Sequence, residues 1–295
     1  MTPTCAIIVR TLNEARYLGQ LLDGIRAQSY PLTCVEVIVV DSGSTDGTLE
    51  IARQYDCKIV RIERAQFSFG RSLNLGCAAT TASLFVFVSG HCVPTSAEWL
   101  WDLVRPLHDP SVAITYGRQL GGPETKFSEH ALLQKYFPDH PANGQSSFFC
   151  NNANSALRSS CWRENRFNET LTGLEDMHLA RTLVQKGHKV VYVPTAAVYH
   201  FHHEKWRQIK RRYEREAIAL REIMPEVHIH WYDALRYFVA GVLGDWARAL
   251  NRKCLHSVFM EVVAFRGCQY WGSWSGNHQH RRLSHREKER YFYPN

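Results

Sequence analysis

The sequence lacks several features that would place it in a specialised class of protein. Its nine cysteines are an odd number and form no Cys-X-X-Cys pair, so neither a disulfide framework nor a zinc ribbon is indicated and we expect reduced thiols. No apolar run approaches the roughly 20 residues that a membrane span needs, and the best candidate, 237–244, is too short. No basic leader precedes the first apolar run, so the sequence predicts no signal peptide.

The composition that is present is typical of a globular protein. The chain has 295 residues, of which 45% are hydrophobic and 21% charged, which suits one large α/β domain with a helical appendage. The net charge of +7 lies in the C-terminal third, because residues 204–295 hold 17 Lys+Arg and 10 Asp+Glu, whereas residues 1–203 hold 18 of each. Such a basic segment suits a nucleic acid, an anionic membrane or an acidic partner, or is simply a solvated surface.

Short apolar runs alternate with helical patterns through the first two thirds of the chain. We expect strands at residues 6–9, 35–40, 58–62, 84–88 and 189–193, and helices over 18–25, 48–55, 72–79 and 175–186. This alternation predicts an α/β fold with a mainly parallel central sheet covered by helices on both faces.

Polar clusters directly follow three of these strands, at residues 10–14, 41–46 and 89–91. Ligands bind at the carboxyl ends of strands in open α/β sheets, so we expect the three clusters to converge on one cleft. A carboxylate at Asp41 can accept hydrogen bonds from a nucleobase or a ribose, and the turn after it leads to a helix N-terminus that favours anions. We interpret Asp41 as a ligand contact and Asp46 as the N-cap of the following helix.

The pattern changes at Glu204. Apolar residues at spacings of three and four predict an amphipathic helix over 206–224, which Pro225 ends, and a second helical stretch follows over about 233–250. We therefore expect a catalytic domain over 1–203 and a basic helical extension over 204–295, with poor order at its end, beyond Gly272.

Six motifs occur in order between residues 4 and 203. They are residues 7–14 (IIVRTLNE), 37–48 (VIVVDSGSTDGT), 71–76 (RSLNLG), 89–94 (SGHCVP), 151–158 (NNANSALR) and 174–176 (LED). This ordered set resembles the family 2 glycosyltransferases with the Rossmann-like GT-A fold. The similarity is closest to bacterial rhamnosyltransferase-like members that build surface polysaccharides.

The resemblance implies a nucleotide-sugar donor, held by the loops after the first strands. Arg71 would approach the base or the diphosphate, and Asn74 would anchor the backbone nearby. The implied donor-binding residues are Thr11, Asn13, Glu14, Asp41, Ser42, Arg71, Ser89 and Gly90.

The chain departs from the family where Asp-X-Asp is usual and residues 89–91 read Ser-Gly-His. In the family the last Asp ligates a divalent cation that bridges the donor phosphates. His91 offers an imidazole instead, which suits Mn²⁺ better than Mg²⁺, and we expect it to pair with His200 or His202. The alternative is an enzyme without a metal, in which His91 itself contacts the diphosphate.

The resemblance assigns catalysis to the pair Glu175-Asp176. An inverting transfer needs a base near the acceptor hydroxyl; Asp176 would be this base, Glu175 would orient the acceptor or the loop, and Arg181 would pair with them or steady the diphosphate. Taken without the other motifs, the pair is equally an acidic first turn favoured by the helix dipole.

A polar run near residue 150 suits a saccharide. Amides of Asn152 and Asn154 match sugar hydroxyls, and Trp162 offers an aromatic platform, although an Asn-rich loop and a core Trp are equally open. The neighbours His91 and Cys92 point apart at a strand end, so a Cys–His hydrolase is excluded.

The resulting interpretation is an inverting glycosyltransferase, hexosyl or deoxyhexosyl (EC 2.4), that acts on a glycan or lipid-linked saccharide. The alternatives are an inactive GT-A scaffold and a nucleic-acid-binding protein acting through the basic third, which has no RRM, KH or zinc-knuckle pattern. We therefore expect no nucleic-acid partner.

We expect a cytoplasmic protein that contacts the inner membrane face peripherally. The first C-terminal helix has an apolar stripe beside basic residues, as in interfacial helices. The stripe comprises Trp206, Ile209, Tyr213 and Leu220. The alternative is that the stripe packs on the catalytic domain or forms a homodimer.

Overall fold

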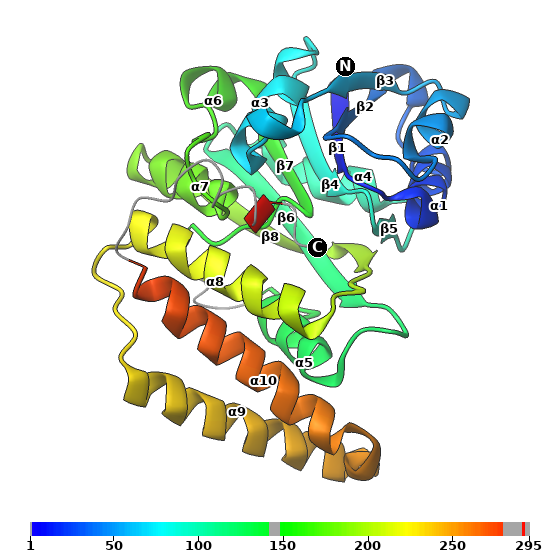
Figure 1. Cartoon of the computed structure of the whole chain (residues 1–295). Coiled ribbons are helices and arrows are strands. Elements are labelled where there is room, and N and C mark those ends of the chain that lie inside the picture. The colour runs from blue at the N-terminus through cyan, green and yellow to red at the C-terminus, as the bar shows by residue number, and fades with distance from the viewer. Residues whose placement is uncertain (1, 142–147, 280–290, 293–295) are drawn as a thin grey trace. The chain divides into compact units, whose positions relative to one another are not determined.

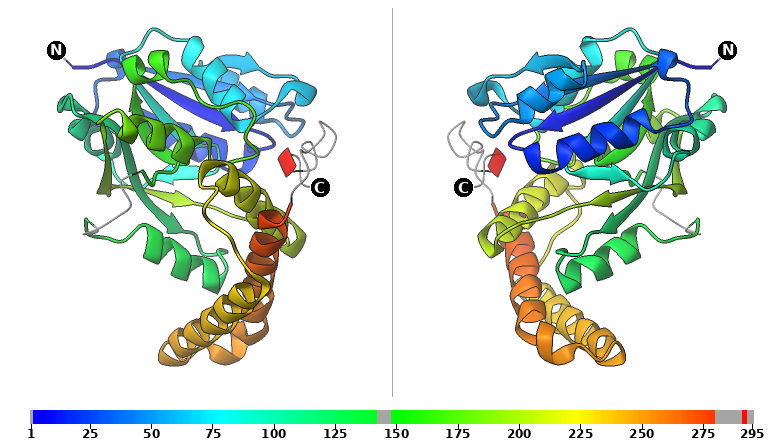
Figure 2. Two further views of the ribbon diagram at one scale, coloured as in Figure 1. Left: turned by 90° about the vertical axis from the view of Figure 1, so that its left-hand side faces the viewer. Right: turned by 90° about the vertical axis from the view of Figure 1, so that its right-hand side faces the viewer.

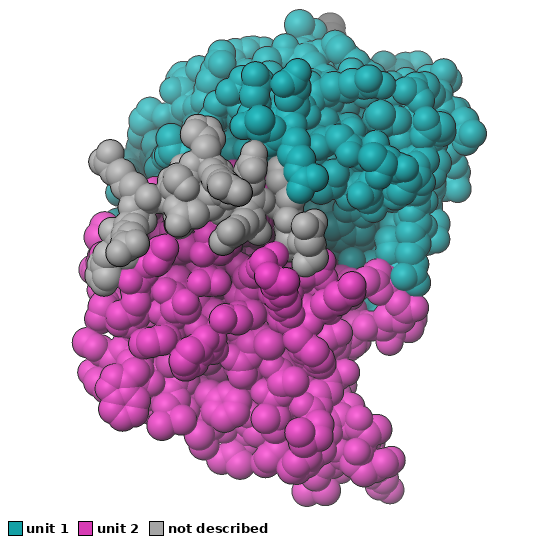
Figure 3. All heavy atoms as spheres, in the orientation of Figure 1, with its two compact units in different colours: residues 1–122, 136–170, 175–201 teal, residues 123–135, 171–174, 202–295 magenta. Residues whose placement is uncertain are grey.

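The computed structural model describes residues 2–141, 148–279 and 291–292. The chain divides into two compact units (Figure 3). Unit 1 comprises Met1–Gly122, Tyr136–Thr170 and Glu175–Phe201, and unit 2 comprises Pro123–Lys135, Leu171–Leu174 and His202–Asn295. The last division falls two residues before the boundary expected from the sequence. Two short segments that the sequence analysis placed in the catalytic domain, 123–135 and 171–174, group with the C-terminal helices instead.

Unit 1 is built on one mixed sheet of eight strands among the described residues, in the order β3-β2-β1-β4-β7-β6-β8-β5. Strands β3, β2, β1 and β4 are parallel, as are β6 and β8, while β7 and β5 pair antiparallel with their neighbours. The strands are Cys5–Thr11 (β1), Val35–Asp41 (β2), Lys58–Arg61 (β3), Leu84–Ser89 (β4), Cys92–Pro94 (β5), Val112–Gly121 (β6), Asn154–Arg158 (β7) and Lys189–His200 (β8). The sequence predicted the four strands of the parallel half and the first part of β8, but not β5, β6 or β7.

Helices cover both faces of this sheet (Figures 1 and 2). On one face, Ile7 and Val9 pack in a single core with Leu18 and Trp99; on the other, Phe85 meets Trp162 edge to face. Burial from both sides explains why β1 and β4 are almost continuously apolar. The first face carries Ala15–Arg26 (α1), Thr48–Gln54 (α2) and Trp99–Val104 (α4), and the second Phe69–Ala78 (α3), Ser159–Glu164 (α6) and Glu175–Gln185 (α7). Short 3₁₀ turns lie at Leu32–Cys34, Arg64–Gln66 and Arg105–His108.

Unit 2 is helical, and α10 lies between α8 and α9 (Figure 1). Two glycines let α10 approach α8 closely, because a Cβ at Gly272 or Gly276 would lie 2.5 Å and 2.1 Å from backbone oxygens of α8. The helices are Phe127–Tyr136 (α5), Trp206–Ile223 (α8), Trp231–Asn251 (α9) and Leu255–Asn277 (α10). Helix α10 continues regularly past Gly272, and residues 280–290 and 293–295 of the expected poorly ordered end lie outside the described residues.

The apolar stripe of α8 is a packing surface. Ile209 is fully buried, and Tyr213 meets Phe265 of α10 edge to face at 6.3 Å. These two residues of the stripe therefore pack within unit 2, whereas Trp206 at the start of α8 is 40% exposed. Contact of the stripe with a membrane stays a prediction. Within the part of the chain that the structure describes, no helix combines the length and the apolar character needed to cross a bilayer.

Candidate active site

The polar loops that follow β1, β2 and β4 meet, as the sequence predicted. Asn13 accepts a hydrogen bond from the backbone N–H of Thr45 at 2.8 Å and donates its own N–H to Ser44 at 2.9 Å. The loop after β4 reaches the same place, since a Cβ on Gly90 would lie 2.9 Å from the side chain of Glu14. Only glycine fits at position 90 beside Glu14 without displacing that side chain.

Asp41 organises the loop after β2. One carboxylate oxygen accepts the backbone N–H groups of Gly43 and Ser44 at 2.9 Å and 3.0 Å, and the other accepts the hydroxyls of Thr11 and Ser44. All four lone-pair positions of the buried carboxylate are thus engaged. A nucleotide N–H or hydroxyl would bind Asp41 by displacing one of the two hydroxyl donors.

Asp46 lies one residue before the N-cap of α2, which is Gly47, so the prediction that Asp46 is itself the N-cap is wrong by one position. Its carboxylate still binds the first residue of two helices. One oxygen accepts the N–H of Thr48 at the start of α2, and the other accepts the N–H of Ala15 at the start of α1, each at 3.1 Å. Burial opposes a lowered pKa, but hydrogen bonds to Thr48 and Ala15 lower the pKa of Asp46. Asp46 therefore holds together the two helix N-termini that flank the loops.

His91 and His200 form a pair at the end of the sheet. The Nε2 atoms lie 3.0 Å apart, while the Nδ1 atoms lie 2.7 Å from a carboxylate oxygen of Glu14 and the amide oxygen of Gln119, respectively. In the tautomer that donates from Nδ1 to these oxygens, the two Nε2 atoms direct lone pairs at each other. This arrangement suits a cation between the rings, and an acceptor oxygen behind each ring is typical of metal-binding histidines.

His202, the alternative partner expected for His91, belongs to unit 2. There its Nδ1 lies 2.8 Å from Glu129, which also receives Arg212 at 2.8 Å. Burial opposes ionisation of Glu129, but His202 and Arg212 together lower its pKa to about 2. The described contacts of His202 are those of a charged network of unit 2.

Glu175 is held by Arg10, a residue to which the sequence analysis gave no role. The guanidinium donates to Glu175 at 3.1 Å and lies over the ring of Phe69 at 4.9 Å. This ion pair ties the end of β1 to the first turn of α7, although the two residues are 165 positions apart.

Asp176 has an unusual protonation equilibrium. Burial, followed by the neighbouring Glu175, raises its pKa to about 7, although N–H groups of Asn152 and Met177 and the charge of Arg10 oppose the shift. Asn152 donates its backbone N–H to Asp176 at 2.9 Å. A buried carboxyl with a raised pKa beside a second carboxylate is typical of acid–base sites.

The amides near Asp176 differ in their freedom to bind a ligand. Asn152 is buried, accepts the Ser155 hydroxyl at 2.8 Å, and has no hydrogen-bond partner for its Nδ2 among the described residues. Asn154 receives the Trp99 indole N–H at 2.9 Å and donates to two backbone oxygens. Asn152 therefore keeps a free donor, whereas the expected sugar contact at Asn154 is wrong because its amide is used in the core.

Trp162 is not available as a sugar platform. It is buried in the core, packs against Phe85 and donates its indole N–H to Asn74 at 3.0 Å. Asn74 also donates to the backbone of Phe167 at 2.9 Å, which confirms its expected anchoring role. The open alternative of a core tryptophan is the correct one.

The remaining expected site residues lie around the same loops. Thr11 and Ser42 are buried, and the Ser42 hydroxyl donates to the Thr11 carbonyl at 3.2 Å. Arg71 lies in the first turn of α3, where its guanidinium donates to Gln66 at 3.3 Å. Ser89 ends β4 and Arg181 lies on α7.

Two functional signals escaped the sequence analysis for different reasons. Gln119 orients His200 from β6, a strand that was not predicted. Leu174 has a positive φ of 54° directly before the acidic pair, a conformation that residues with side chains rarely adopt and that often marks functional sites.

The thiol of Cys92, beside His91, is not a nucleophile, because burial raises its pKa. All nine cysteines are free.

Comparison with known proteins agrees with this architecture. Residues 6–205 match the family described as glycosyl transferase family 2. The chain is 30% identical to the O-antigen chain rhamnosyltransferase RfbN of Salmonella typhimurium, over 70% of this chain and 69% of that protein. It is also 30% identical to the O-antigen chain rhamnosyltransferase WbaN of Salmonella anatum, over 60% of each.

Solved structures share the fold. The mannosyltransferase PcManGT of Pyrobaculum calidifontis, determined with GDP-Man and Mn²⁺, has a TM-score of 0.65 at 17% identity, over 95% of this chain and 89% of that chain. Residues 1–349 of TarS from S. aureus, determined with UDP-GlcNAc, give 0.54 at 14% identity, over 93% and 90%. At these identities the likeness concerns the fold alone.

Proposed function

Because this chain belongs to glycosyl transferase family 2, we propose that it transfers a sugar from a nucleotide-diphosphate donor to a saccharide acceptor with inversion at the anomeric carbon. The observation that carries the proposal is Asp176, a buried carboxyl whose pKa of about 7 suits a general base at neutral pH. The rhamnosyltransferase relatives favour a deoxyhexosyl donor and an acceptor in surface-polysaccharide synthesis.

The proposed step is a single displacement. The acceptor oxygen attacks the anomeric carbon while its proton passes to the carboxylate of Asp176, and the bond from that carbon to the diphosphate oxygen breaks. Glu175, ion-paired with Arg10, lies next to Asp176 and helps to raise the pKa of that carboxyl, which strengthens Asp176 as a base. Asn152 offers its unpartnered Nδ2 to an acceptor hydroxyl.

We propose that the loops at residues 10–14, 41–46 and 89–91 bind the donor. Their mutual hydrogen bonds hold them in place before any ligand arrives, which lowers the entropic cost of binding. Arg71, from α3, supplies a positive charge for the diphosphate.

His91 and His200 would hold a divalent cation. The fit rests on their facing Nε2 lone pairs and on the oxygens of Glu14 and Gln119 that orient the rings. Such an ion neutralises charge on a departing diphosphate, and a two-imidazole set favours Mn²⁺ over Mg²⁺.

The proposal is tested by thermal-shift titration of UDP, dTDP, GDP and CMP, each with and without Mn²⁺, followed by transfer assays with the nucleotide that binds. We expect one diphosphate nucleotide to raise Tm, and more so with Mn²⁺. No binding to any of the nucleotides would overturn the proposal. Binding with no hydrolysis or transfer of the cognate nucleotide sugars would instead indicate an inactive scaffold.

A further inference from the structure

Helix α9 carries an exposed apolar stripe. Its members follow one another at intervals of four, four and seven residues, which places them on one side of the helix. Val242 and Ala249 face inward and are buried. Leu243 is 57% and Leu250 64% exposed. The members of the stripe are Leu235, Val239, Leu243 and Leu250. Contiguous apolar exposure of this kind marks an interaction surface.

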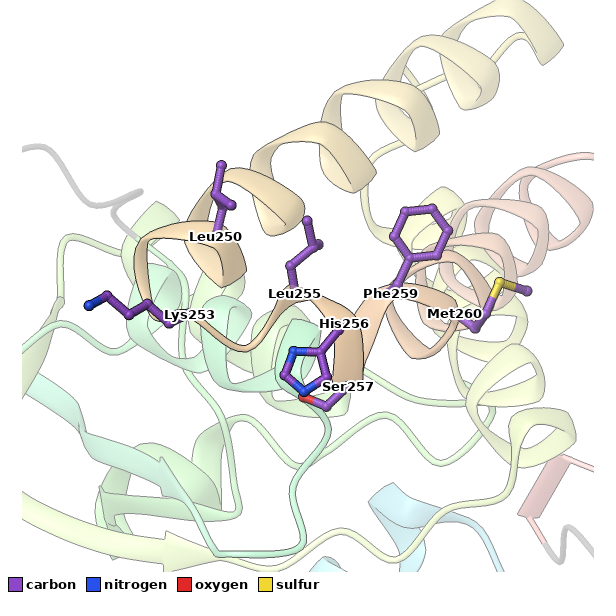
Figure 4. Close-up of a pocket in the computed structure, with 7 residues that line it drawn as sticks. All are labelled: Leu250, Lys253, Leu255, His256, Ser257, Phe259 and Met260. Atoms are coloured by element: carbon purple, nitrogen blue, oxygen red, sulfur yellow. The ribbon is translucent and has the colours of Figure 1, made fainter.

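The stripe continues into the turn between α9 and α10. A hollow there is lined by four apolar side chains, Leu250, Leu255, Phe259 and Met260, together with Lys253, His256 and Ser257 (Figure 4). Met260 is 70% exposed. The apolar surface thus extends from one helix to the next and ends beside a cation.

Aromatic side chains lie at the other end of the stripe. Trp231, at the first position of α9, is 66% exposed, and Tyr232 and Trp271 are also exposed. Trp and Tyr prefer the boundary between lipid and water, because each has an apolar ring and a polar group.

The charged groups around the stripe are predominantly basic. Asp245 is fully buried in an ion pair with Arg266, Glu261 accepts a backbone N–H, and Asp233 lies 3.7 Å from Arg236. Among the described residues, Arg252 and Lys253 form no ion pair and leave the turn positively charged. The basic positions are Arg236, Arg248, Arg252 and Lys253.

We propose that this α9–α10 face, the stripe of α9 with Trp231, Tyr232, Phe259, Met260 and Lys253, binds the surface of an anionic phospholipid bilayer, with α9 lying in the interface. Anionic headgroups complement the basic turn, whereas a second copy of the chain would present the same positive charge to it. The inference rests on the proposed function in one respect: an acceptor at the membrane would explain why the enzyme binds there. It assigns membrane contact to α9 and the start of α10, whereas Ile209 and Tyr213 of the α8 stripe pack within unit 2.

The test is co-sedimentation of the full chain with vesicles of equal parts phosphatidylglycerol and phosphatidylcholine, without donor or acceptor. We expect binding that weakens at high salt and on pure phosphatidylcholine. Leu243→Glu and Leu250→Glu should each lower vesicle affinity at least about tenfold, because each places a charge where an apolar side chain enters lipid. Leu32→Glu is the matched control, an exposed leucine of unit 1, and should bind as the wild type does.

Two further measurements make the outcome decisive. The nucleotide thermal shift of each variant should equal that of the wild type, which shows that unit 1 is folded. Light scattering should give the same mass for wild type and variants. Failure of the wild type to bind anionic vesicles, or wild-type binding by both glutamate variants, overturns the inference. A wild-type dimer that Leu243→Glu converts to a monomer, without vesicle binding, overturns it in favour of a subunit interface. If the wild type binds the vesicles but binds none of the nucleotides, only the proposed function is overturned.

Discussion

His91 and His200 face each other with Nε2 atoms 3.0 Å apart, and both rings are oriented from behind by an oxygen. When both rings donate from Nδ1 to these oxygens, the two Nε2 lone pairs converge, which is unfavourable without a cation between them. A shared cation removes this repulsion, so the pair gives a physical reason to expect a metal where the usual carboxylate is missing.

Removal of the metal should abolish transfer. We expect EDTA to eliminate activity and Mn²⁺ to restore it better than Mg²⁺, since two imidazoles favour the softer ion. His91→Ala should lower metal affinity at least about tenfold, measured by calorimetry with Mn²⁺ alone. His108→Ala, an exposed histidine of unit 1, is the control and should bind Mn²⁺ normally. Full activity in EDTA would show that His91 acts without a metal.

Asp176→Asn should lower kcat by about 10²–10⁴, because the amide cannot accept the proton of the acceptor. Affinity for the donor nucleotide should remain within about threefold of the wild type, since Asp176 lies outside the three donor loops. Steady-state kinetics and nucleotide titration separate the two effects. Turnover at the wild-type rate would remove Asp176 from the role of base.

Stability should depend on pH through the same carboxyl. The folded pKa of Asp176, about 7, is raised above the ordinary 3.8, so the folded state holds the proton more tightly. The contribution of Asp176 to the free energy of unfolding is therefore fully present below about pH 4 and is lost as pH rises through about 7. The loss amounts to at most about 4 kcal/mol. The free energy of unfolding, measured with denaturant, should fall less between pH 5 and pH 8 for Asp176→Asn than for the wild type. Equal falls would mean that Asp176 titrates normally.

Arg10→Met should move the pH profile of transfer. The methionine keeps apolar contact with Phe69 but removes the positive charge that lowers the pKa of Asp176, so the acidic limb of kcat/KM should shift to higher pH. Arg10→Lys keeps the charge and should restore most of the profile. A reduced rate with an unmoved profile would indicate that Arg10 acts only by packing.

Asp41→Ala should weaken both the fold and donor binding. It leaves the part-buried N–H groups of Gly43 and Ser44 without their acceptor, at a cost of about 1 kcal/mol for each lost hydrogen bond. Thr11→Val removes one hydroxyl donor and leaves the carboxylate in place, so its effect on stability should be smaller. Nucleotide affinity should fall about 10- to 150-fold in Asp41→Ala; an unchanged Kd would exclude Asp41 from the donor site.

The strands of the parallel half of the sheet, and the loops that follow them, could be predicted from the sequence alone. A strand buried on both faces must be apolar throughout, as β1 and β4 are, and polar loops at strand ends must meet when the strands are parallel. The start of α2 could likewise be predicted to within one residue, because helix starts depend on residues only a few positions apart; the N-cap is Gly47, next to the predicted Asp46.

Only the tertiary structure could decide contacts between distant segments. Arg10 meets Glu175, and His91 meets His200, because β1, β5 and β8 bring them together, and no local pattern encodes those pairings. The tertiary structure also decides which of two nearby asparagines can bind a ligand. The amide of Asn154 is fully used by hydrogen bonds in the core, whereas Asn152 keeps a free donor. Helical periodicity identified an apolar side on α8 and a second helix over about 233–250, but it could not tell that α10 packs against α8 while much of the apolar surface of α9 is exposed to solvent, because which side of a helix is covered depends on its neighbours in space.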